Sequence, residues 1–571
     1  MMKFSWWGVI LAILTLFVAL SFGFTYGESN QNTYLINALQ IIDPSLFVND
    51  WFASKTVHYH DLFHLIILIF NFSKIPLNWG TAVLEVITKI ISIYVIYMLI
   101  RSLTPRYANY VFLFVLTVIL IDRTQSVGHS YIYSSIFQPS SIGSLFTILG
   151  LFFFTRQNYF YSGACLAFGG LFHINFLLIA FVYLGVAHLV LGRENFFNRC
   201  ILQFSLMLMV FLWKLPFLMS MIDSQYADKA GDIFLFIRSP HHYNPSHYSM
   251  DFLKLLGWGA IGFSGLLIID KKSLINMRIF ALYWGLTLTL FFSYIFTAIV
   301  FTPVISKLFF WRIAPFWELL SLIIFLSAFF EVALSQNLLH KGNRRLLYCA
   351  GLFYLGCILY FRHMLYFQDI YIAKVLVLLL FIMPVSILFV YNLFEVKASR
   401  GYKGKLILLS SVLSILVASI NTINKEKNNS LKFSLKPLQS EEIELYDWIS
   451  LTSIDSVFLT PPQMYKFRFW SRRAIIVDWK STPIDPNGVV EWYSRMEDVS
   501  GIKGVKTRVD ATTGFNSMTE ERIKQLKNKY HFNYLVMLNK EHKLTQKQNN
   551  DKLPFPVVFT NNKFSVYLIN V

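Results

Sequence analysis

Long apolar runs alternate with short polar segments over the first 421 residues of the chain. Runs of about twenty apolar residues are typical of membrane-spanning helices. The pattern predicts a polytopic α-helical membrane protein of about 13 spans, with a tight hairpin at 158–190. No small-residue cleavage site follows the first run, so we expect that span to be retained. The predicted spans are 5–24, 76–100, 107–121, 138–154, 158–172, 174–190, 200–222, 252–269, 279–300, 308–330, 346–361, 371–394 and 406–421.

Basic residues fall in alternate loops between these predicted spans. With the N-terminus in the cytoplasm, every short inner loop carries Lys or Arg, as the positive-inside rule requires. An odd number of spans then places the C-terminal region on the extracytoplasmic face. The inner-loop bases are Arg101, Arg106, Arg156, Arg193, Arg199, Lys271, Lys272, Arg278, Lys341, Arg344, Arg345, Lys397, Arg400, Lys403 and Lys405.

The composition changes after residue 421. We interpret residues 1–421 as the transmembrane domain, 422–436 as a polar linker and 437–571 as a small extracytoplasmic α/β domain. Helical and strand patterns alternate in the last segment, which is typical of a sheet covered by helices. The predicted helices are 441–450, 488–499 and 519–530, and the predicted strands are 457–460, 473–479, 533–538, 556–560 and 564–569.

Composition and charge narrow the class of protein. The chain is 55% hydrophobic and 17% aromatic, more apolar surface than a soluble core could bury. The net charge of +18 comes mostly from the loops that set topology, so a nucleic-acid partner is not expected. Its richness in Phe, Ile, Asn and Lys suggests a bacterial genome, and hence a bacterial inner membrane. The four cysteines lie in apolar segments and imply no disulfide framework.

The loop at 25–75 follows the first span and holds two acids of interest, Glu28 and Asp50. Between them, apolar residues recur at roughly helical spacing, as expected for a helix on a membrane surface; these are Tyr34, Leu35, Leu39 and Ile42. Either carboxylate could act as a general base toward an acceptor hydroxyl, or help hold a divalent cation such as Mg²⁺ or Mn²⁺. The alternative is that Glu28 caps the helix and Asp50 is simply solvated.

Cations gather in two later outer segments. Arg238, His241 and His242 lie beside prolines in RSPHHYNP, a combination suited to the oxygens of a lipid-linked phosphate. The alternative is an aromatic and imidazole belt at headgroup level. Lys307 and Arg312 follow in SKLFFWRIAPFWE. Snorkelling explains Lys307, whereas Arg312 needs a buried partner or a lipid phosphate.

Histidines also cluster after the first acidic loop. His58, His60, Asp61 and His64 have a spacing that could hold a metal, and the last two histidines share a helix face. No cysteine or HExxH pattern accompanies them, so we assign no metal site and interpret them as interfacial residues. His173 is expected in a turn near the outer face.

Together these features resemble the GT-C class of integral-membrane glycosyltransferases, whose members use lipid-phosphate-linked sugar donors. The resemblance rests on the order of segments along the chain, which is one span, then a long acidic loop, then many spans, then an outer α/β domain. In the C-terminal region it rests on Phe458-Leu-Thr-Pro-Pro462, Phe467-Arg468, Ser471-Arg472-Arg473, Val477-Asp-Trp-Lys480, Pro483 and Glu491-Trp492-Tyr-Ser-Arg495, which look like the tail of a bacterial branch of the class.

The resemblance implies sugar transfer from a polyprenyl-phosphate carrier to a glycan, lipid or protein acceptor on the outer face. Glu28 or Asp50 would deprotonate the acceptor, and the cations of the two outer segments would stabilise the departing phosphate. Members of the class usually carry an acidic residue or an acidic pair in the first outer loop, whereas Gly27-Glu28-Ser29 supplies one acid with no adjacent partner. That departure leaves the identity of the base open between the two residues.

Three other functions fit a polytopic membrane protein. A transporter or flippase of lipid-linked glycans would normally show an inverted repeat, which this sequence lacks. A glycan polymerase would normally place its large loop late among the spans, whereas the longest loop here is the first. A non-catalytic protein of envelope assembly stays open, and substitution of the two acids discriminates these functions.

Overall fold

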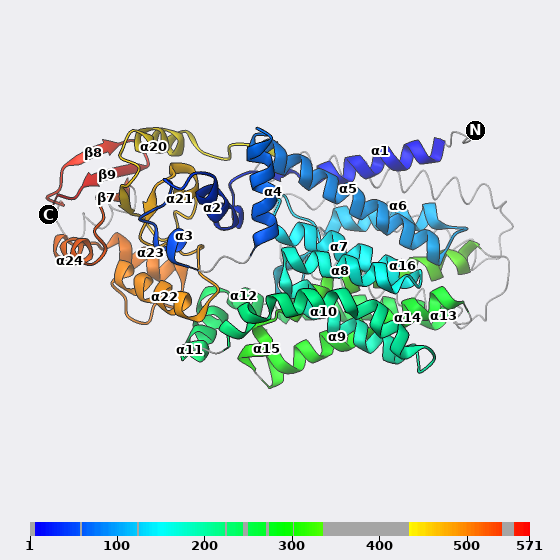
Figure 1. Ribbon diagram of the computed structural model, residues 1–571. Helices are drawn as coiled ribbons and strands as arrows, with labels where there is room; N and C mark the ends of the chain where they lie inside the picture. Colours follow the sequence, from blue (N-terminus) through cyan, green and yellow to red (C-terminus); the bar gives the residue numbers. More distant parts are fainter. Residues whose placement is uncertain are drawn as a thin grey trace.

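The computed structural model describes residues 6–56, 60–122, 125–222, 225–243, 249–269, 273–300, 302–334, 433–539 and 553–570 (Figure 1). The helices of a long bundle run roughly side by side, and an α/β unit lies at one end of them. The predicted spans at 346–361, 371–394 and 406–421, together with His58, lie outside the described residues.

The first ten predicted spans coincide with helices of the bundle. Four described helices are long and apolar enough to cross a membrane, and seven shorter helices are also apolar. The chain is therefore a polytopic helical membrane protein. The bundle helices are α1 (Trp6–Ser21), α5 (Leu77–Leu103), α6 (Ala108–Asp122), α7 (Pro139–Thr155), α8 (Tyr159–Phe172), α9 (Ile174–Val190), α10 (Phe196–Ser220), α13 (Ser249–Ile268), α14 (Leu274–Tyr294) and α16 (Ala314–Leu334).

Glycines allow several of these helices to approach closely. A Cβ at Gly163 of α8 would overlap the carbonyl oxygen of Gln203 in α10, and one at Gly285 of α14 would overlap that of Tyr183 in α9. Small residues at helix contacts are the usual means of packing in lipid, where van der Waals contact replaces the hydrophobic effect. The turn between α8 and α9 is the single residue His173, and Gly169-Gly170 lies within α8.

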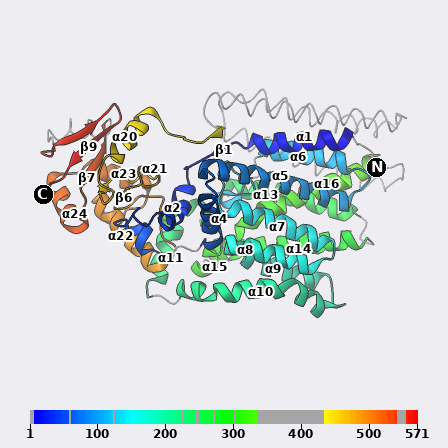
Figure 2. The same ribbon diagram turned by 45° about the horizontal axis from the view of Figure 1, so that its top comes forward.

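The loop at 25–75 folds into short elements between the bundle and the α/β unit. These are β1 (Phe24–Thr25), α2 (Gln31–Ile42), α3 (Trp51–Lys55) and α4 (Asp61–Phe72). Figure 2 shows α2 and α4 between the two parts of the molecule. The apolar side chains of α2, among them Leu35, Ile36 and Leu39, are buried against α4 and α21. The face predicted to lie on a membrane surface therefore packs on protein.

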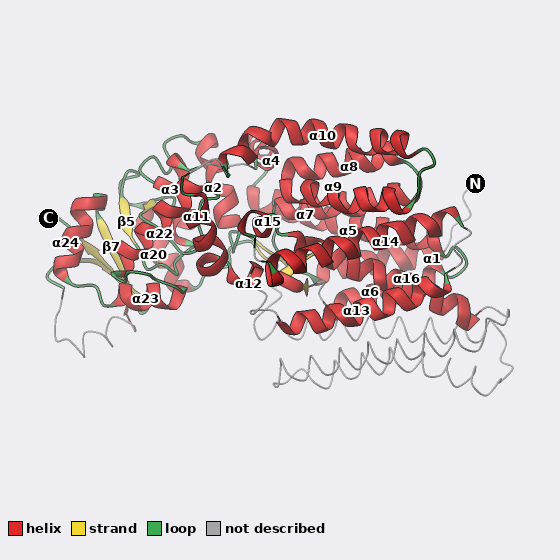
Figure 3. Cartoon of the chain, turned by 90° about the horizontal axis from the view of Figure 1, so that it is seen from below, coloured by secondary structure: helices red, strands yellow, loops and turns green. Residues whose placement is uncertain are grey.

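Short segments from later in the chain cap the same end of the bundle. Figure 3 shows α11, α12 and α15 where the bundle meets the α/β unit. Gly128 has a positive φ of 66° in the turn between two of these segments, a conformation that favours glycine. The segments are β2 (Gln125–Ser126), η1 (Val127–His129), β3 (Ser130–Tyr131), α11 (Ala227–Asp232), the π-helical turn η2 (Ile233–Arg238), α12 (Pro240–Tyr243), η4 (Ile295–Ile299), α15 (Pro303–Lys307) and η5 (Phe310–Ile313).

The C-terminal unit is a five-stranded sheet of order β6-β5-β7-β9-β8 with helices on both faces. β6, β5 and β7 are parallel, and β9 and β8 add an antiparallel hairpin. Its elements are β4 (Phe433–Ser434), α20 (Ser440–Ser450), β5 (Val457–Leu459), α21 (Phe467–Ser471), β6 (Ala474–Ile475), α22 (Pro486–Ser500), α23 (Arg508–Asn516), α24 (Glu520–Tyr530), β7 (Tyr534–Leu538), β8 (Val557–Thr560) and β9 (Phe564–Leu568).

The central strands β5 and β7 are buried on both faces, because helices cover each side of the sheet there and successive strand residues point to opposite sides. Leu459 and Leu535 pack against one set of helices around Trp492 of α22, whereas Phe458 and Val536 pack with α20 on the other side. β4 pairs in parallel with β1, so the start of this unit is joined to the segment that follows the first span.

Candidate functional site

A cleft of about 170 Å³ lies where the end of the bundle meets the C-terminal unit. It is bounded by α2, α3 and α4 of the first loop, by η2, and by the loop that follows β6. None of the described lining residues carries a carboxylate. The lining residues are Asn30, Thr33, Tyr34, Phe52, His60, His64, Phe234, Arg238, Ser239, Lys480, Thr482, Pro483 and Ile484.

Arg238 joins η2 to the C-terminal unit at this cleft. Its Nε donates to Oγ1 of Thr482 at 2.7 Å, and its Nη2 donates to the carbonyl oxygen of Lys480 at 2.9 Å. Burial lowers the pKa of Arg238 to about 10, and the nearby charge of Asp478 opposes that shift. The guanidinium is still charged at neutral pH, and no described carboxylate forms an ion pair with it. The predicted anion-binding residue Arg238 thus brings an uncompensated positive charge to the cleft.

Lys480 adds a second cation from the C-terminal unit. Burial lowers the pKa of Lys480 to about 8, and repulsion from Arg238 and Arg508 acts in the same direction, against the attraction of Asp478. Among the described residues, none forms a hydrogen bond or an ion pair with its ammonium group. Two like charges side by side in a half-buried cleft are costly, and a bound anion would remove that cost.

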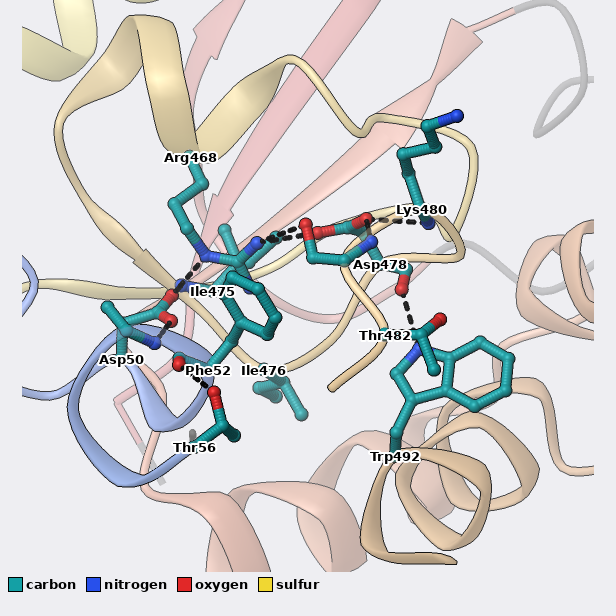
Figure 4. A network of polar contacts seen from close by, with 12 residues as sticks. Asp50, Phe52, Thr56, Arg468, Ile475, Ile476, Asp478, Lys480, Thr482 and Trp492 are labelled. Carbon is teal, nitrogen blue, oxygen red and sulfur yellow. Dashed lines mark hydrogen bonds and ion pairs between the residues drawn. The ribbon is translucent and has the colours of Figure 1, made fainter. Parts of the chain in front are cut away.

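The loop carrying Lys480 is held in place by a buried network, shown in Figure 4. Arg468 lies between two acids, with Nε 2.7 Å from Oδ2 of Asp50 and Nη1 2.7 Å from Oδ2 of Asp478. The other oxygen of Asp478 accepts the backbone N–H groups of Lys480 and Ser481 at 2.8 and 2.7 Å. The side chain of Lys480 points away from this network. The network therefore fixes the backbone of the loop and leaves the ammonium group unused.

Asp50 has a structural position that its sequence context does not reveal. Its side chain is fully buried, accepts the N–H of Ala53 as the cap of α3, and accepts the N–H of Ile475 at 3.0 Å. Together with Arg468, these donors occupy both carboxylate oxygens. A general base must reach the proton it removes. The predictions that Asp50 is solvated or acts as the base therefore do not agree with this position.

Glu28 lies outside the cleft, two residues before Asn30, which lines it. Its carboxylate forms an ion pair with Lys466 and accepts a hydrogen bond from Tyr465 at 3.3 Å. The side chain is 20% exposed, so solvent reaches it. Glu28 is therefore accessible to solvent, as Asp50 is not, and it already has the cation Lys466 beside it.

Two histidines line the cleft from α4. His60 and His64 are both buried rather than interfacial, because α2 and the C-terminal unit cover this face of α4. Nδ1 of His60 lies 2.9 Å from the carbonyl oxygen of Phe172, which can only accept, so Nδ1 carries the hydrogen. In the neutral ring, Nε2 is then the nitrogen that can accept a proton. Tyr34 packs edge-on against the ring, with centroids 4.7 Å apart.

Arg312 shares this neighbourhood from the bundle side. Its guanidinium lies over the rings of Phe176 and Phe309, with Cζ at 5.4 and 5.2 Å from the two ring centroids. Its Nε is buried and has no hydrogen-bond partner among the described residues. Burial raises the pKa of Tyr34 to about 12, and the charges of Arg312 and Arg238 both oppose that shift. The structure therefore brings these two predicted cations to the same tyrosine.

Arg312 itself does not line the cleft, and the remaining predicted cations also lie outside its lining. His242 is half-buried beside His241, with ring centroids 4.1 Å apart. Desolvation and the charge of His241 hold the pKa of His242 well below the usual value. Its Nδ1 lies 2.7 Å from the carbonyl oxygen of Gly128, so the neutral ring offers phosphate neither a charge nor a free N–H. That geometry does not fit the predicted role of His242. Lys307 donates to the carbonyl oxygen of Ala227 in α11.

Metal ligation has no ready-made set of side chains in the described part of the chain. No group of three or more His, Cys, Asp or Glu residues there has an arrangement that could hold an ion. His58 lies outside the described residues. The divalent cation stays a prediction.

Sequence reasoning missed two contributions to the cleft. Tyr34 was interpreted as part of a lipid-facing stripe, although its hydroxyl is a signal for a polar partner when the ring is buried. The spacing of His60 and His64 indicates a shared helix face, and nothing in it predicts that they line a cleft. Only the packing of α2 on α4 brings these three residues together.

Comparison with known proteins bears on the fold. Residues 440–499, which contain Arg468, Asp478 and Lys480, match a family model described as a domain of unknown function, DUF6798. No curated protein matches the sequence. A crystal structure of ArnT from Cupriavidus metallidurans bound to undecaprenyl phosphate is similar over 98% of this chain and 97% of that chain, at 14% identity and a TM-score of 0.51. The apo structure of the same protein gives 13% identity, coverage of 98% and 96%, and a TM-score of 0.48. The chain thus has the fold of ArnT, which is a GT-C glycosyltransferase.

Proposed function

We propose that this protein is a membrane glycosyltransferase that uses a lipid-phosphate-linked sugar donor. The observation that carries the proposal is the uncompensated positive charge of Arg238 in the cleft at the end of the bundle. A phosphate on a lipid is an anion that a membrane could deliver to this place, and Arg binds phosphate oxygens well. Undecaprenyl phosphate is the lipid bound by ArnT, which has the same fold, and it supports this class of donor.

The reaction we propose is transfer to a hydroxyl-bearing acceptor on the extracytoplasmic face of a bacterial inner membrane, with the N-terminus in the cytoplasm. The acceptor oxygen forms a bond to the anomeric carbon while the bond from that carbon to the phosphate oxygen breaks. The electron pair leaves with the phosphate, whose charge Arg238 and Arg312 stabilise. The acceptor proton passes to a general base.

Glu28 is the acid we propose for that proton transfer. Its carboxylate is solvent-accessible and precedes the cleft-lining part of α2, whereas that of Asp50 is fully buried. Lys466 must release Glu28, or move with it, for the carboxylate to reach an acceptor. If Glu28 does not serve, Nε2 of His60 is the alternative inside the cleft.

The test is sugar transfer by the purified protein in lipid vesicles, with a panel of polyprenyl-phosphate sugars and release of the carrier as readout. We expect Arg238→Gln to lower turnover by about 100-fold or more, since removing one transition-state donor typically costs that much. Arg193→Gln is the matched control, because Arg193 is exposed and lies outside the cleft. Equal turnover of these two variants would contradict a role for the cleft.

Glu28→Gln and His60→Gln identify the base in the same assay. We expect Glu28→Gln to abolish turnover and to leave donor binding intact, and repeating the assay with EDTA tests the predicted divalent cation. Loss of turnover in His60→Gln, with normal turnover in Glu28→Gln, would identify His60 as the general base. Transport of a lipid-linked glycan across the vesicle membrane without carrier release would favour a flippase.

A further inference from the structure

The wall of the cleft opposite the bundle comes from the C-terminal unit. The loop between β6 and α22 lines the cleft there with Lys480, Thr482, Pro483 and Ile484. We propose that Lys480 is a phosphate ligand of the lipid donor, so that the C-terminal unit completes the donor site. This inference rests on the proposed function and adds a residue to its binding machinery.

The charge arrangement is the first reason. Lys480 and Arg238 come from different parts of the chain and meet at one cleft, where each side chain is half-buried. Arg508 of α23 adds a third positive charge near both, and Asp478 is the acid that acts on both. Because both oxygens of Asp478 already accept hydrogen bonds from Arg468 and from backbone N–H groups, that acid has little capacity left to compensate these cations.

The rigidity of the loop is the second reason. Asp478 accepts the N–H of Lys480, and Arg238 donates to the carbonyl oxygen of the same residue. The peptide groups on both sides of Lys480 are therefore held, while no described residue engages its ammonium group. A ligand-binding side chain on a fixed backbone loses little entropy when it binds. Packing alone gives no reason to hold a lysine in this way.

The chemistry favours a phosphate carried by a lipid. The other polar side chains that line the cleft suit anion oxygens and neutral sugar hydroxyls; they are Asn30, Thr33, Tyr34, His60, His64, Ser239 and Thr482. The cleft adjoins the end of an apolar bundle, so a phosphate attached to a lipid could enter it while its chain stays beside the helices. Free inorganic phosphate would share the headgroup chemistry and lack that anchor.

The experiment measures binding of undecaprenyl phosphate to the full-length protein in detergent micelles by isothermal titration, between pH 7 and 9. A phosphate monoester is mostly a dianion over this range, whereas Lys480, with a pKa of about 8, loses its proton. We therefore expect the affinity of the wild type to fall as the pH rises. Arg238 has a pKa of about 10 and is still mostly charged at pH 9. The other charged and titratable groups that face Lys480 or the cleft are Asp478, Arg508, Tyr34, His60 and His64.

Two substitutions separate the charge of Lys480 from its packing. We expect Lys480→Met, which keeps the apolar stem, to weaken binding at pH 7 by about tenfold, the loss of one charge-assisted hydrogen bond, and to remove the fall in affinity toward pH 9. Lys480→Arg should bind as the wild type does at pH 7 and keep that affinity to pH 9. Lys524→Met is the control, because Lys524 is an exposed lysine of the same unit.

The outcomes separate this inference from the proposed function. Binding by Lys480→Met with the affinity and pH profile of the wild type would overturn the role of Lys480 and leave the proposed function intact. A wild type that binds no undecaprenyl phosphate at any pH would overturn both. Phosphatidylglycerol micelles and inorganic phosphate are the comparison ligands, and equal binding of either would overturn a site built for the lipid-linked phosphate.

Discussion

At the scale of single residues, the ion pairs of Arg468 decide what Asp50 does. Breaking a buried charge pair by removing one partner costs about 3–5 kcal/mol, because the other charge is left uncompensated. Arg468 keeps Asp478 when Asp50 is neutralised, so we expect Asp50→Asn to cost nearer the lower end, about 3 kcal/mol. Thermal unfolding of the purified protein measures this loss, and Asp447→Asn, on an exposed acid of α20, is the control.

Kinetics complete that prediction. The folded fraction of Asp50→Asn should transfer sugar at the wild-type rate, because the carboxylate touches only protein donors. Full stability with lost turnover would instead make Asp50 the base. Sequence could not assign this role, since the partner Arg468 lies 418 residues away along the chain.

At the scale of elements, apolar run length was enough to place helices of the bundle. The first ten predicted spans coincide with observed helices. In lipid, a spanning segment must satisfy its backbone hydrogen bonds internally, so it forms a helix, and a long apolar run in the sequence marks that helix. In the C-terminal unit, α21 and α23 were not predicted, since five and nine residues are too few to show a clear period. The predicted strand 473–479 shortens to β6 because Asp478 draws the following N–H groups into a turn.

The contact of α9 with α14 gives a prediction at this scale. Gly285→Ala would place a Cβ on the carbonyl oxygen of Tyr183, and backbone atoms cannot rotate away as a side chain can. The two helices must separate, at a cost of about 1–3 kcal/mol. Thermal unfolding in detergent should show that loss for Gly285→Ala and almost none for Gly185→Ala, whose Cβ would meet no atom within 4 Å. Equal unfolding temperatures would mean that the helices are not in such close contact.

At the scale of the whole molecule, the cleft is assembled from segments between residues 30 and 484. Arg238 was predicted from its polar surroundings, whereas the sequence indicates Lys480 only within a motif of the C-terminal region that carries the resemblance. No local pattern pairs them, because the loop after β6 and the turn η2 meet through tertiary packing alone. Motifs along the chain could therefore indicate the class of ligand and some of its residues, whereas the shape of the site required the fold.

The junction of the two parts can be tested at Gly27. This residue has a φ of +64°, and its carbonyl oxygen accepts a hydrogen bond from Nε1 of Trp470 at 3.1 Å. A Cβ there would lie 2.5 Å from Cζ2 of Trp470 and 2.6 Å from Cε1 of Phe469, so Gly27→Ala must push the C-terminal unit from the first loop. Gly504→Ala has a matching φ of +70° and meets no atom within 4 Å.

Both substitutions carry the backbone cost of a left-handed alanine, roughly 1–2 kcal/mol, and only the first disturbs the junction. We expect Gly27→Ala to lower the unfolding temperature further and to shift the tryptophan emission to longer wavelength as Trp470 becomes hydrated. Its affinity for undecaprenyl phosphate should also fall, because the loop at Lys480 moves away from Arg238. If Gly27→Ala and Gly504→Ala behave alike in all three measurements, the two parts of the molecule do not depend on this contact, and donor binding belongs to the bundle alone.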